Sequence, residues 1–186
     1  MAFPSCFAAL PVPALPELTA LHDGLPPELR RIHPEDQHLT IAYFGRIDPA
    51  LHAPLLDALG GVPFDGARVV LDAVLPLPSR EHPSALTLTL EPGDGKDAIV
   101  ALMHDQRAPL AAIAGTPVET RPPLPHVTFA RPRGRRMTDA RRDAVLAWAD
   151  AQPALGCAVE LGGLVLMRSR PPGGPGPHYE IVQPPR

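Results

Sequence analysis

A four-residue pattern occurs twice in this chain, as His-Leu-Thr-Ile at 38–41 and as His-Val-Thr-Phe at 126–129. In each copy apolar residues alternate with polar ones, which is typical of a half-buried β-strand. Side chains two positions apart on a strand point to the same face of the sheet. Each copy therefore predicts a strand that presents an imidazole and a hydroxyl on one face and apolar side chains on the other.

The segments around the two copies follow one order: strand, helix, motif strand, helix, strands. We expect strands at 3–12, 38–44, 65–75, 85–90, 126–131, 157–167 and 178–183. We expect helices within 14–31, from Asp48-Pro49 to 59, over 99–113, and from a cap at Thr138. This order predicts an α+β protein with an approximate internal duplication, in which the histidines of both motif strands face a shared groove.

Composition excludes some classes of protein. No apolar run approaches the ~20 residues of a membrane helix, and the first residues lack the basic start of a signal peptide, so we expect a cytoplasmic protein. A net charge of −3 argues against a general coat for nucleic acid, although it leaves room for one basic cleft. Cys6 and Cys157 are isolated, and we expect them to be buried in strands as free thiols.

The repeated histidines suit transfer of a phosphoryl group. One neutral imidazole, of His38 or His126, can take a proton from the attacking oxygen, while the other, protonated, gives a proton to the departing oxygen. The hydroxyls of Thr40 and Thr128 can hold non-bridging phosphate oxygens between them. This scheme needs no metal and no cofactor. The other six histidines share no metal-ligand spacing, and we expect them in surface or turn positions.

Two further side chains are candidates for binding substrate. Arg131 follows the second motif and could clamp a phosphate at the end of its strand. Strict alternation places Phe44 on the face of His38 and Tyr43 on the opposite face, so Phe44 could stack on a base, with core packing as the alternative. A further run of arginines is expected on a solvated loop, with contact to an RNA backbone as the alternative: Arg133, Arg135 and Arg136.

At these residues the chain resembles the 2H phosphoesterase superfamily, and more narrowly the bacterial and archaeal RNA 2′,3′-cyclic phosphodiesterases, also called 2′-5′ RNA ligases. The segments that carry the resemblance are 31–45, 125–131, 165–170 and 178–180. It implies a bilobal fold of pseudo-two-fold duplicated lobes, with two antiparallel sheets forming a central groove and helices on the outside. Residues 1–186 would then form a single domain of two intertwined lobes, and the protein is expected to be a monomer.

The resemblance also implies a function. His38 would be the general acid and His126 the general base, with Thr40 and Thr128 as phosphate binders and Arg131 as a phosphate or RNA contact. The expected reaction is metal-independent opening of a terminal 2′,3′-cyclic phosphate on RNA to a 2′-phosphate, with 2′-5′ ligation as its reverse. Three alternatives stay open. They are a phosphodiesterase on a small cyclic phosphate such as an ADP-ribose derivative, a non-catalytic RNA-binding module, and a metal-dependent hydrolase.

Overall fold

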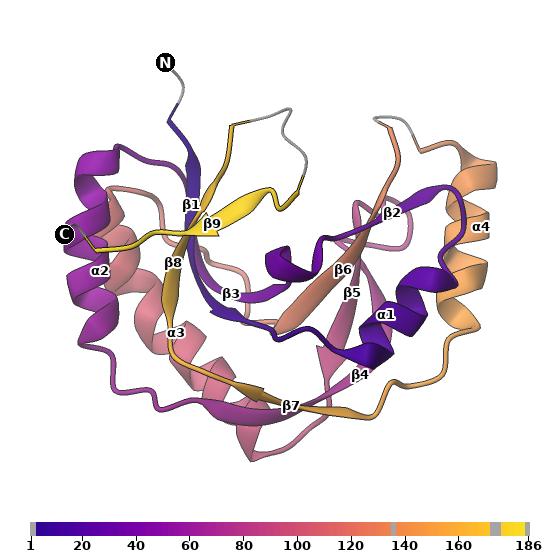
Figure 1. Ribbon diagram of the computed structural model, residues 1–186, viewed down its shortest axis with the longest axis horizontal. Helices are drawn as coiled ribbons and strands as arrows, with labels where there is room; N and C mark the ends of the chain where they lie inside the picture. The colour runs from indigo at the N-terminus through magenta and orange to yellow at the C-terminus, as the bar shows by residue number, and fades with distance from the viewer. Residues whose placement is uncertain (1–2, 135–136, 172–175, 185–186) are drawn as a thin grey trace.

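A nine-stranded antiparallel sheet is the framework of the computed structural model, which describes residues 3–134, 137–171 and 176–184 (Figure 1). Its strands are β1 (Ser5–Pro11), β2 (Leu29–Arg31), β3 (His38–Arg46), β4 (Ala67–Leu77), β5 (Ala85–Leu90), β6 (His126–Pro132), β7 (Cys157–Leu161), β8 (Val165–Ser169) and β9 (Tyr179–Ile181). Eight of them follow the order β7-β4-β5-β6-β3-β1-β8-β9, and β2 pairs with the end of β6.

Four α-helices lie outside the curved sheet: α1 (Pro16–Asp23), α2 (His52–Gly60), α3 (Asp94–Ala114) and α4 (Asp139–Asp150). In Figure 1, α2 and α3 lie at the left and α1 and α4 at the right. The predicted caps are confirmed, because Asp48 accepts a hydrogen bond from the Ala50 amide and Thr138 from the Arg141 amide. None of the described helices is both long and apolar enough to cross a membrane.

The two motif strands meet at the centre of the sheet. β3 and β6 pair through one residue pair, Leu39 opposite Val127. These are the residues that follow the two motif histidines, so an approximate two-fold axis passes between them. On one side of this axis lie β6, β5, β4 and β7, and on the other lie β3, β1, β8 and β9. The predicted α+β fold with a central groove is confirmed, and its two antiparallel sheets are joined by this single pair.

The two halves of the chain exchange elements. β4 follows the first motif along the chain but pairs with β5 of the second half, whereas β8 pairs with β1 of the first half. The first helix of each half also packs on the motif strand of the other, since α1 contacts β6 and α3 contacts β3. The single-domain organisation stays a prediction, which this exchange supports because neither half could bury its apolar face alone.

The helix expected within 14–31 is confirmed and spans Pro16–Asp23, while Leu29–Arg31 form a strand, β2, that the sequence did not predict, because Pro26-Pro27 stops a helix there. The strand expected over 157–167 is two strands, separated by Gly162-Gly163, and these lie in opposite halves of the sheet. The prolines and glycines of 171–177 predict a loop between the last two strands, and this loop lies partly outside the described residues, which omit 172–175.

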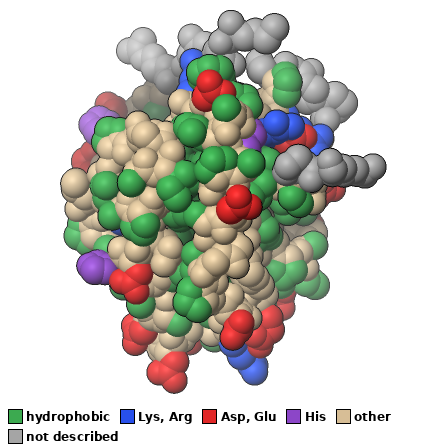
Figure 2. Space-filling view, turned by 90° about the vertical axis from the view of Figure 1, so that its left-hand side faces the viewer, with side chains coloured by type: hydrophobic (Ala, Val, Ile, Leu, Met, Phe, Trp, Pro, Cys, Tyr) green, Lys and Arg blue, Asp and Glu red, His purple; other side chains and the backbone are tan. Residues whose placement is uncertain are grey.

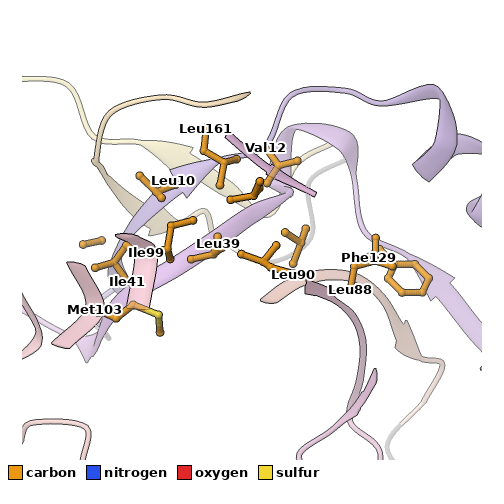
Figure 3. Packing of buried hydrophobic residues seen from close by; sticks show 14 of the residues in the cluster. Leu10, Val12, Leu39, Ile41, Leu88, Leu90, Ile99, Met103, Phe129 and Leu161 are labelled. Atoms are coloured by element: carbon orange, nitrogen blue, oxygen red, sulfur yellow. The ribbon is translucent and has the colours of Figure 1, made fainter. Parts of the chain in front are cut away.

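The main core lies between the sheet and its helices. Leu39 and Ile41 of β3 point away from the groove and pack in one cluster with Ile99 and Met103 of α3 (Figure 3). Phe129 of β6 is fully buried in the same cluster. Full burial of such a side chain contributes about 2 kcal/mol. The apolar positions of both motifs therefore fix the strands, which leaves the polar positions on the other face.

Both cysteines are free and buried, as predicted. The Cys6 thiol lies 3.5 Å from Nε2 of His52. Burial raises the pKa of the Cys6 thiol to about 11. The thiol is therefore neutral at physiological pH and keeps a proton that it can share with the His52 imidazole in this buried hydrogen bond.

Helix α3 approaches β4 too closely for any side chain at Gly95. A Cβ built there would lie 1.9 Å from the carbonyl oxygen of Arg68. We therefore expect Gly95→Ala to lower the free energy of unfolding by about 1–3 kcal/mol in urea denaturation, because the helix must move. Gly60→Ala is the matched control, since apart from its chain neighbours and the backbone of its own helix nothing lies within 4 Å of its Cβ position. The account of this contact is wrong if both variants unfold at the same urea concentration.

Candidate active site

A pocket of about 250 Å³ lies over the centre of the sheet. Five residues predicted from the sequence line it: His38, Thr40, His126, Thr128 and Arg131. The remaining lining residues are Phe7, Arg30, Ile32, Asp36, Tyr43, His178 and Tyr179. The structure thus brings together two motifs that are 88 positions apart in the sequence.

The two motif histidines are held in the same way. Nδ1 of His38 lies 2.6 Å from the carbonyl oxygen of Asp36, and Nδ1 of His126 lies 2.7 Å from that of Leu124. A carbonyl can only accept, so each Nδ1 carries a proton and donates it. In both rings this leaves Nε2 as the nitrogen available to a ligand, with a lone pair when the imidazole is neutral.

The antiparallel pairing sets the motifs crosswise. Because Leu39 faces Val127 in antiparallel strands, the residue before Leu39 lies beside the residue after Val127. His38 therefore lies on the side of Thr128, and Thr40 on the side of His126. The pocket thus contains two pairs, each of one imidazole and one hydroxyl. This arrangement suits a tetrahedral phosphate that lies between the two imidazoles.

A β-bulge at the same place in both motifs decides which later residues reach the pocket. In β3 the register passes from Thr40 to Ala42 without Ile41, and in β6 from Thr128 to Ala130 without Phe129. A bulge adds one residue and reverses the alternation beyond it. The fifth residue after each histidine consequently faces the pocket. This residue is Tyr43 in the first copy and Arg131 in the second.

The prediction that Phe44 faces the groove is wrong. Phe44 is only 4% exposed and lies in the core cluster, whereas Tyr43 is 59% exposed and lines the pocket. The reason is the bulge at Ile41, which strict alternation does not include. The sequence contained a sign of this bulge. Strict alternation turns Arg131 away from the face of His126 and Thr128, so Arg131 can face the groove only if the alternation reverses in the second copy.

Aromatic rings gather around His38. The ring of Phe7 stacks on the His38 imidazole with centroids 4.6 Å apart, and Tyr179 meets the same imidazole edge-on at 5.6 Å. Phe7 also stacks near Tyr43, at 6.5 Å. Among the described residues, no aromatic ring contacts His126 in this way. The pocket is thus apolar and aromatic beside His38 and more open beside His126.

The buried carboxylate of Asp36 ties the C-terminal segment to the pocket. Its two oxygens accept hydrogen bonds from the backbone amides of His178 and Tyr179, at 2.8 and 2.9 Å. The same residue supplies the carbonyl that orients His38. The expected surface or turn position of His178 is confirmed, since the residue is exposed at a bend, and this contact holds the bend at the pocket. No spacing in the sequence relates residues 36 and 178, so only the fold could reveal the contact.

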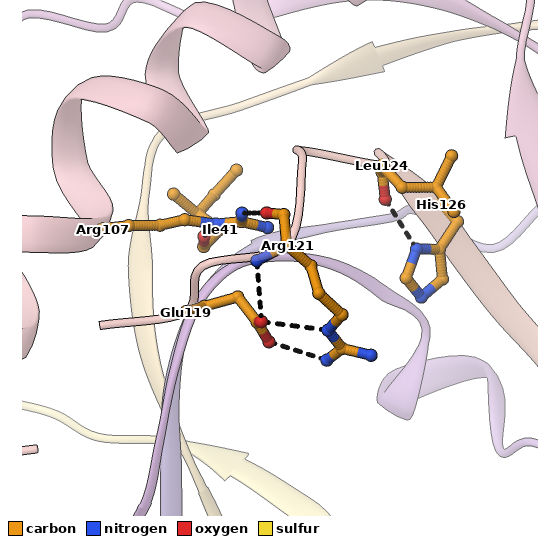
Figure 4. A network of polar contacts seen from close by, with 6 residues as sticks. All are labelled: Ile41, Arg107, Glu119, Arg121, Leu124 and His126. Carbon is orange, nitrogen blue, oxygen red and sulfur yellow. Dashed lines mark hydrogen bonds and ion pairs between the residues drawn. The ribbon is translucent and has the colours of Figure 1, made fainter. Parts of the chain in front are cut away.

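A polar network fixes the loop before His126 (Figure 4). The Arg107 guanidinium donates to the carbonyl oxygen of Arg121 at 2.8 Å, and its Nε lies 3.5 Å from the carbonyl oxygen of Ile41. Arg121 itself forms a two-bond ion pair with Glu119, at 2.9 and 2.7 Å. Both β3 and α3 thereby hold the loop that carries the Leu124 carbonyl.

The surroundings lower the pKa of both motif histidines. Burial is the largest cause for each, since it disfavours the charged imidazolium. The positive charge of Arg131 lowers both pKa values further, and that of Arg121 also lowers the pKa of His126. The hydrogen bonds from Nδ1 to the carbonyls oppose these effects only in part.

The other arginines of the second motif lie elsewhere. Nε of Arg133 donates to the carbonyl oxygen of Leu29 at 2.8 Å, which ties the end of β6 to β2. Arg135 and Arg136 lie outside the described residues. Within the described ranges, no group of three His, Cys, Asp or Glu side chains is placed to hold a metal ion.

Three solved structures share this arrangement of elements over nearly the whole chain. TT0787 of Thermus thermophilus has a TM-score of 0.69 and 21% identity, covering 96% of this chain and 95% of its own. A protein described as a phosphoesterase has a TM-score of 0.69 and 20% identity, covering 97% and 95%. E. coli LigT complexed with NADP+ has a TM-score of 0.67 and 22% identity, covering 98% and 96%. No protein-family model and no curated protein sequence matches the chain.

The chain thus has the fold of E. coli LigT, and its central groove contains two histidines. The fold that the resemblance to the 2H phosphoesterase superfamily implies is therefore confirmed by the likeness to E. coli LigT and to TT0787.

The Asp36 contact generates a prediction about stability. Asp36→Asn can accept one of the two backbone hydrogen bonds but presents an amide donor to the other. We expect it to lower the free energy of unfolding by about 1.5–3 kcal/mol, and to speed hydrogen exchange at the Tyr179 amide. Asp139→Asn is the control, because that carboxylate is 87% exposed and its loss should cost less than about 0.5 kcal/mol. Equal stability of both variants would contradict a structural role of Asp36.

Proposed function

We propose that this protein is a metal-independent phosphodiesterase that opens a 2′,3′-cyclic phosphate at an RNA end to a 2′-phosphate. The observation that carries the proposal is the placement of two imidazoles in one pocket, each with Nδ1 donating to a carbonyl and Nε2 left to a ligand. An in-line displacement at phosphorus needs one base and one acid on opposite sides, which this crosswise arrangement supplies.

In the proposed step, neutral His126 accepts a proton from a water molecule through Nε2 while the water oxygen attacks phosphorus. The bond from phosphorus to O3′ breaks, and protonated His38 gives its Nε2 proton to O3′. The product carries a 2′-phosphate and a free 3′-hydroxyl, and the two histidines have exchanged protonation states. With a ribose 5′-hydroxyl in place of water, the same step forms a 2′-5′ linkage, as in a ligase.

Thr40, Thr128 and Arg131 are proposed to bind the phosphate. The hydroxyls lie two residues after each histidine on the pocket face. Arg131 lies at the pocket, where the one hydrogen bond of its side chain to the described residues is a 3.4 Å contact with the carbonyl oxygen of Ser84. Its guanidinium can form two parallel hydrogen bonds to phosphate oxygens. Together these donors would stabilise the charge that gathers on the non-bridging oxygens in the transition state.

The division of roles rests on the two unlike sides of the pocket. Phe7 and Tyr179 surround His38 with apolar surface, which favours the nucleoside and its departing O3′ on that side. The side of His126 is more open and gives water access to the base. Tyr43, exposed at the pocket, takes the place of Phe44 as the candidate for stacking on a base.

The known proteins of this fold support a nucleotide substrate. E. coli LigT, whose fold this chain shares, has been crystallised with 3′-AMP, with ATP and with phosphate. The face seen in Figure 2 carries scattered acidic side chains and few basic ones on its visible part. This face therefore offers no broad basic surface to an RNA backbone.

Loss of either imidazole should abolish turnover. We expect His38→Ala and His126→Ala each to lower kcat on a nucleoside 2′,3′-cyclic phosphate by roughly 10²–10⁴-fold, because each removes one proton transfer. His104→Ala is the matched control, since that side chain is 80% exposed on α3. The assay is run in excess EDTA, and the product isomer is identified. Near-normal rates in either motif variant, or loss of activity with EDTA, would reject the proposal.

The lowered pKa values predict an acidic pH optimum. The acid must be protonated, so kcat/KM falls as pH rises through its pKa, which lies below 6.5 in the free protein. The base must be neutral, so kcat/KM falls as pH drops through its own lowered pKa. We expect a bell-shaped profile of kcat/KM that already declines above about pH 6.5.

A variant of Arg131 tests whether its positive charge lowers the pKa of the two histidines. Its charge lowers the pKa of both histidines, so Arg131→Gln should move both limbs of the profile to higher pH. A kcat/KM that still rises at pH 8 in the wild type, or limbs that stay fixed in the variant, would contradict this electrostatic account.

A further inference from the structure

Two arginines lie directly opposite each other at one end of the pocket. Arg30 of β2 pairs with Arg131 of β6 in the antiparallel register, and both side chains line the pocket. Like charges at directly opposite positions of a sheet destabilise it. Among the described residues, neither guanidinium has a carboxylate within 4.0 Å.

A third nitrogen group completes this cluster. Nη1 of Arg30 lies 3.5 Å from Nε2 of His178 and donates a weak hydrogen bond to it, which leaves the N–H at Nδ1 of His178 as the donor to a ligand. The Asp36 carboxylate fixes the backbone of His178 through its amide. That carboxylate already accepts two amides, and it forms no ion pair within 4.0 Å with Arg30 or Arg131. Among the described residues, the two guanidiniums of this cluster therefore have no directly paired carboxylate.

The proposed reaction does not account for all of this charge. A cyclic phosphodiester carries one negative charge, and Arg131 with the two threonines is enough to hold it. Arg30 and His178 are left without a role. Nitrogen donors that converge from β2 and from the segment before β9 match a second phosphate group, whose oxygens can accept from all of them.

We propose that Arg30 and His178 form a second phosphate subsite, which takes the phosphate on the 5′ oxygen of the reacting ribose. This inference rests on the proposed function and names its substrate class. The ligand is an RNA end, in which that phosphate is the diester to the preceding nucleotide. The subsite lies beyond Thr128 on the side of His38, where the nucleoside is placed if His38 protonates O3′.

A binding experiment tests the subsite without requiring turnover. The probes are adenosine 2′-monophosphate and adenosine 2′,5′-bisphosphate, measured by calorimetry at one ionic strength. The wild type should bind the bisphosphate at least about tenfold more tightly than the monophosphate, as expected for one charge-assisted phosphate contact. In Arg30→Gln and in His178→Gln this ratio should fall toward one.

Arg68→Gln, which removes an exposed charge on β4, should keep the full ratio and serves as the matched control. Because each variant is judged by its own ratio, a general loss of affinity does not affect the result. An equal affinity of the wild type for both probes, or a ratio that survives in both pocket variants, would overturn the subsite.

Hydrolysis assays then identify the source of the second phosphate. The substrates are adenosine 2′,3′-cyclic phosphate, a diadenosine ending in the same group, and ADP-ribose 1″,2″-cyclic phosphate. The dinucleotide should have the highest kcat/KM, and a higher value for the ADP-ribose compound would overturn the assignment to RNA. If no substrate is cleaved, the proposed function fails, while the binding ratios still decide the subsite.

Discussion

The pairing of β3 with β6 is the constraint on which the rest of this structure depends. One residue pair, Leu39 with Val127, joins the two halves of the sheet. Both side chains are fully buried, so the strands are held from the core side. Since the strands are antiparallel, the same pair sets each motif histidine beside the threonine of the other motif. The pocket therefore follows from the approximate two-fold symmetry about the Leu39–Val127 pair.

Departures from that symmetry give the pocket two unlike sides. The equivalent bulges bring Tyr43 to one position and Arg131 to the other. Phe7 and Tyr179 cover His38, and Asp36 holds the segment that carries Tyr179. In the proposed mechanism, water would reach His126 as the base, while a nucleoside would pack beside His38 as the acid. Symmetry places the two histidines, and the later differences are proposed to divide the roles of acid and base between them.

The sequence was sufficient for the parts of the structure that follow from local pattern. Alternation within each motif predicted two strands with His38, Thr40, His126 and Thr128 on the pocket face, and the caps at Asp48 and Thr138 predicted two helix starts. Phe44 could not be placed correctly, because a bulge depends on the register with a neighbouring strand.

No local sequence pattern could predict the contacts between distant segments of the chain. The carboxylate of Asp36 meets amides 142 and 143 positions away, and Arg30 faces Arg131 only because β2 adds to the end of β6. These contacts build the wall of the pocket opposite the motifs. Recognition of a substrate depends on the residues of this wall more than on the two histidine motifs.

A crystal structure with a nucleoside 2′,3′-cyclic vanadate would test the central claim most directly, because five-coordinate vanadium imitates phosphorus during displacement. The account predicts that Nε2 of His38 and Nε2 of His126 lie within about 3.2 Å of oxygens at the two opposite apical positions. The vanadate would also accept from Thr40 and Thr128. Vanadium bound by a single imidazole, or bound outside this pocket, would contradict the account.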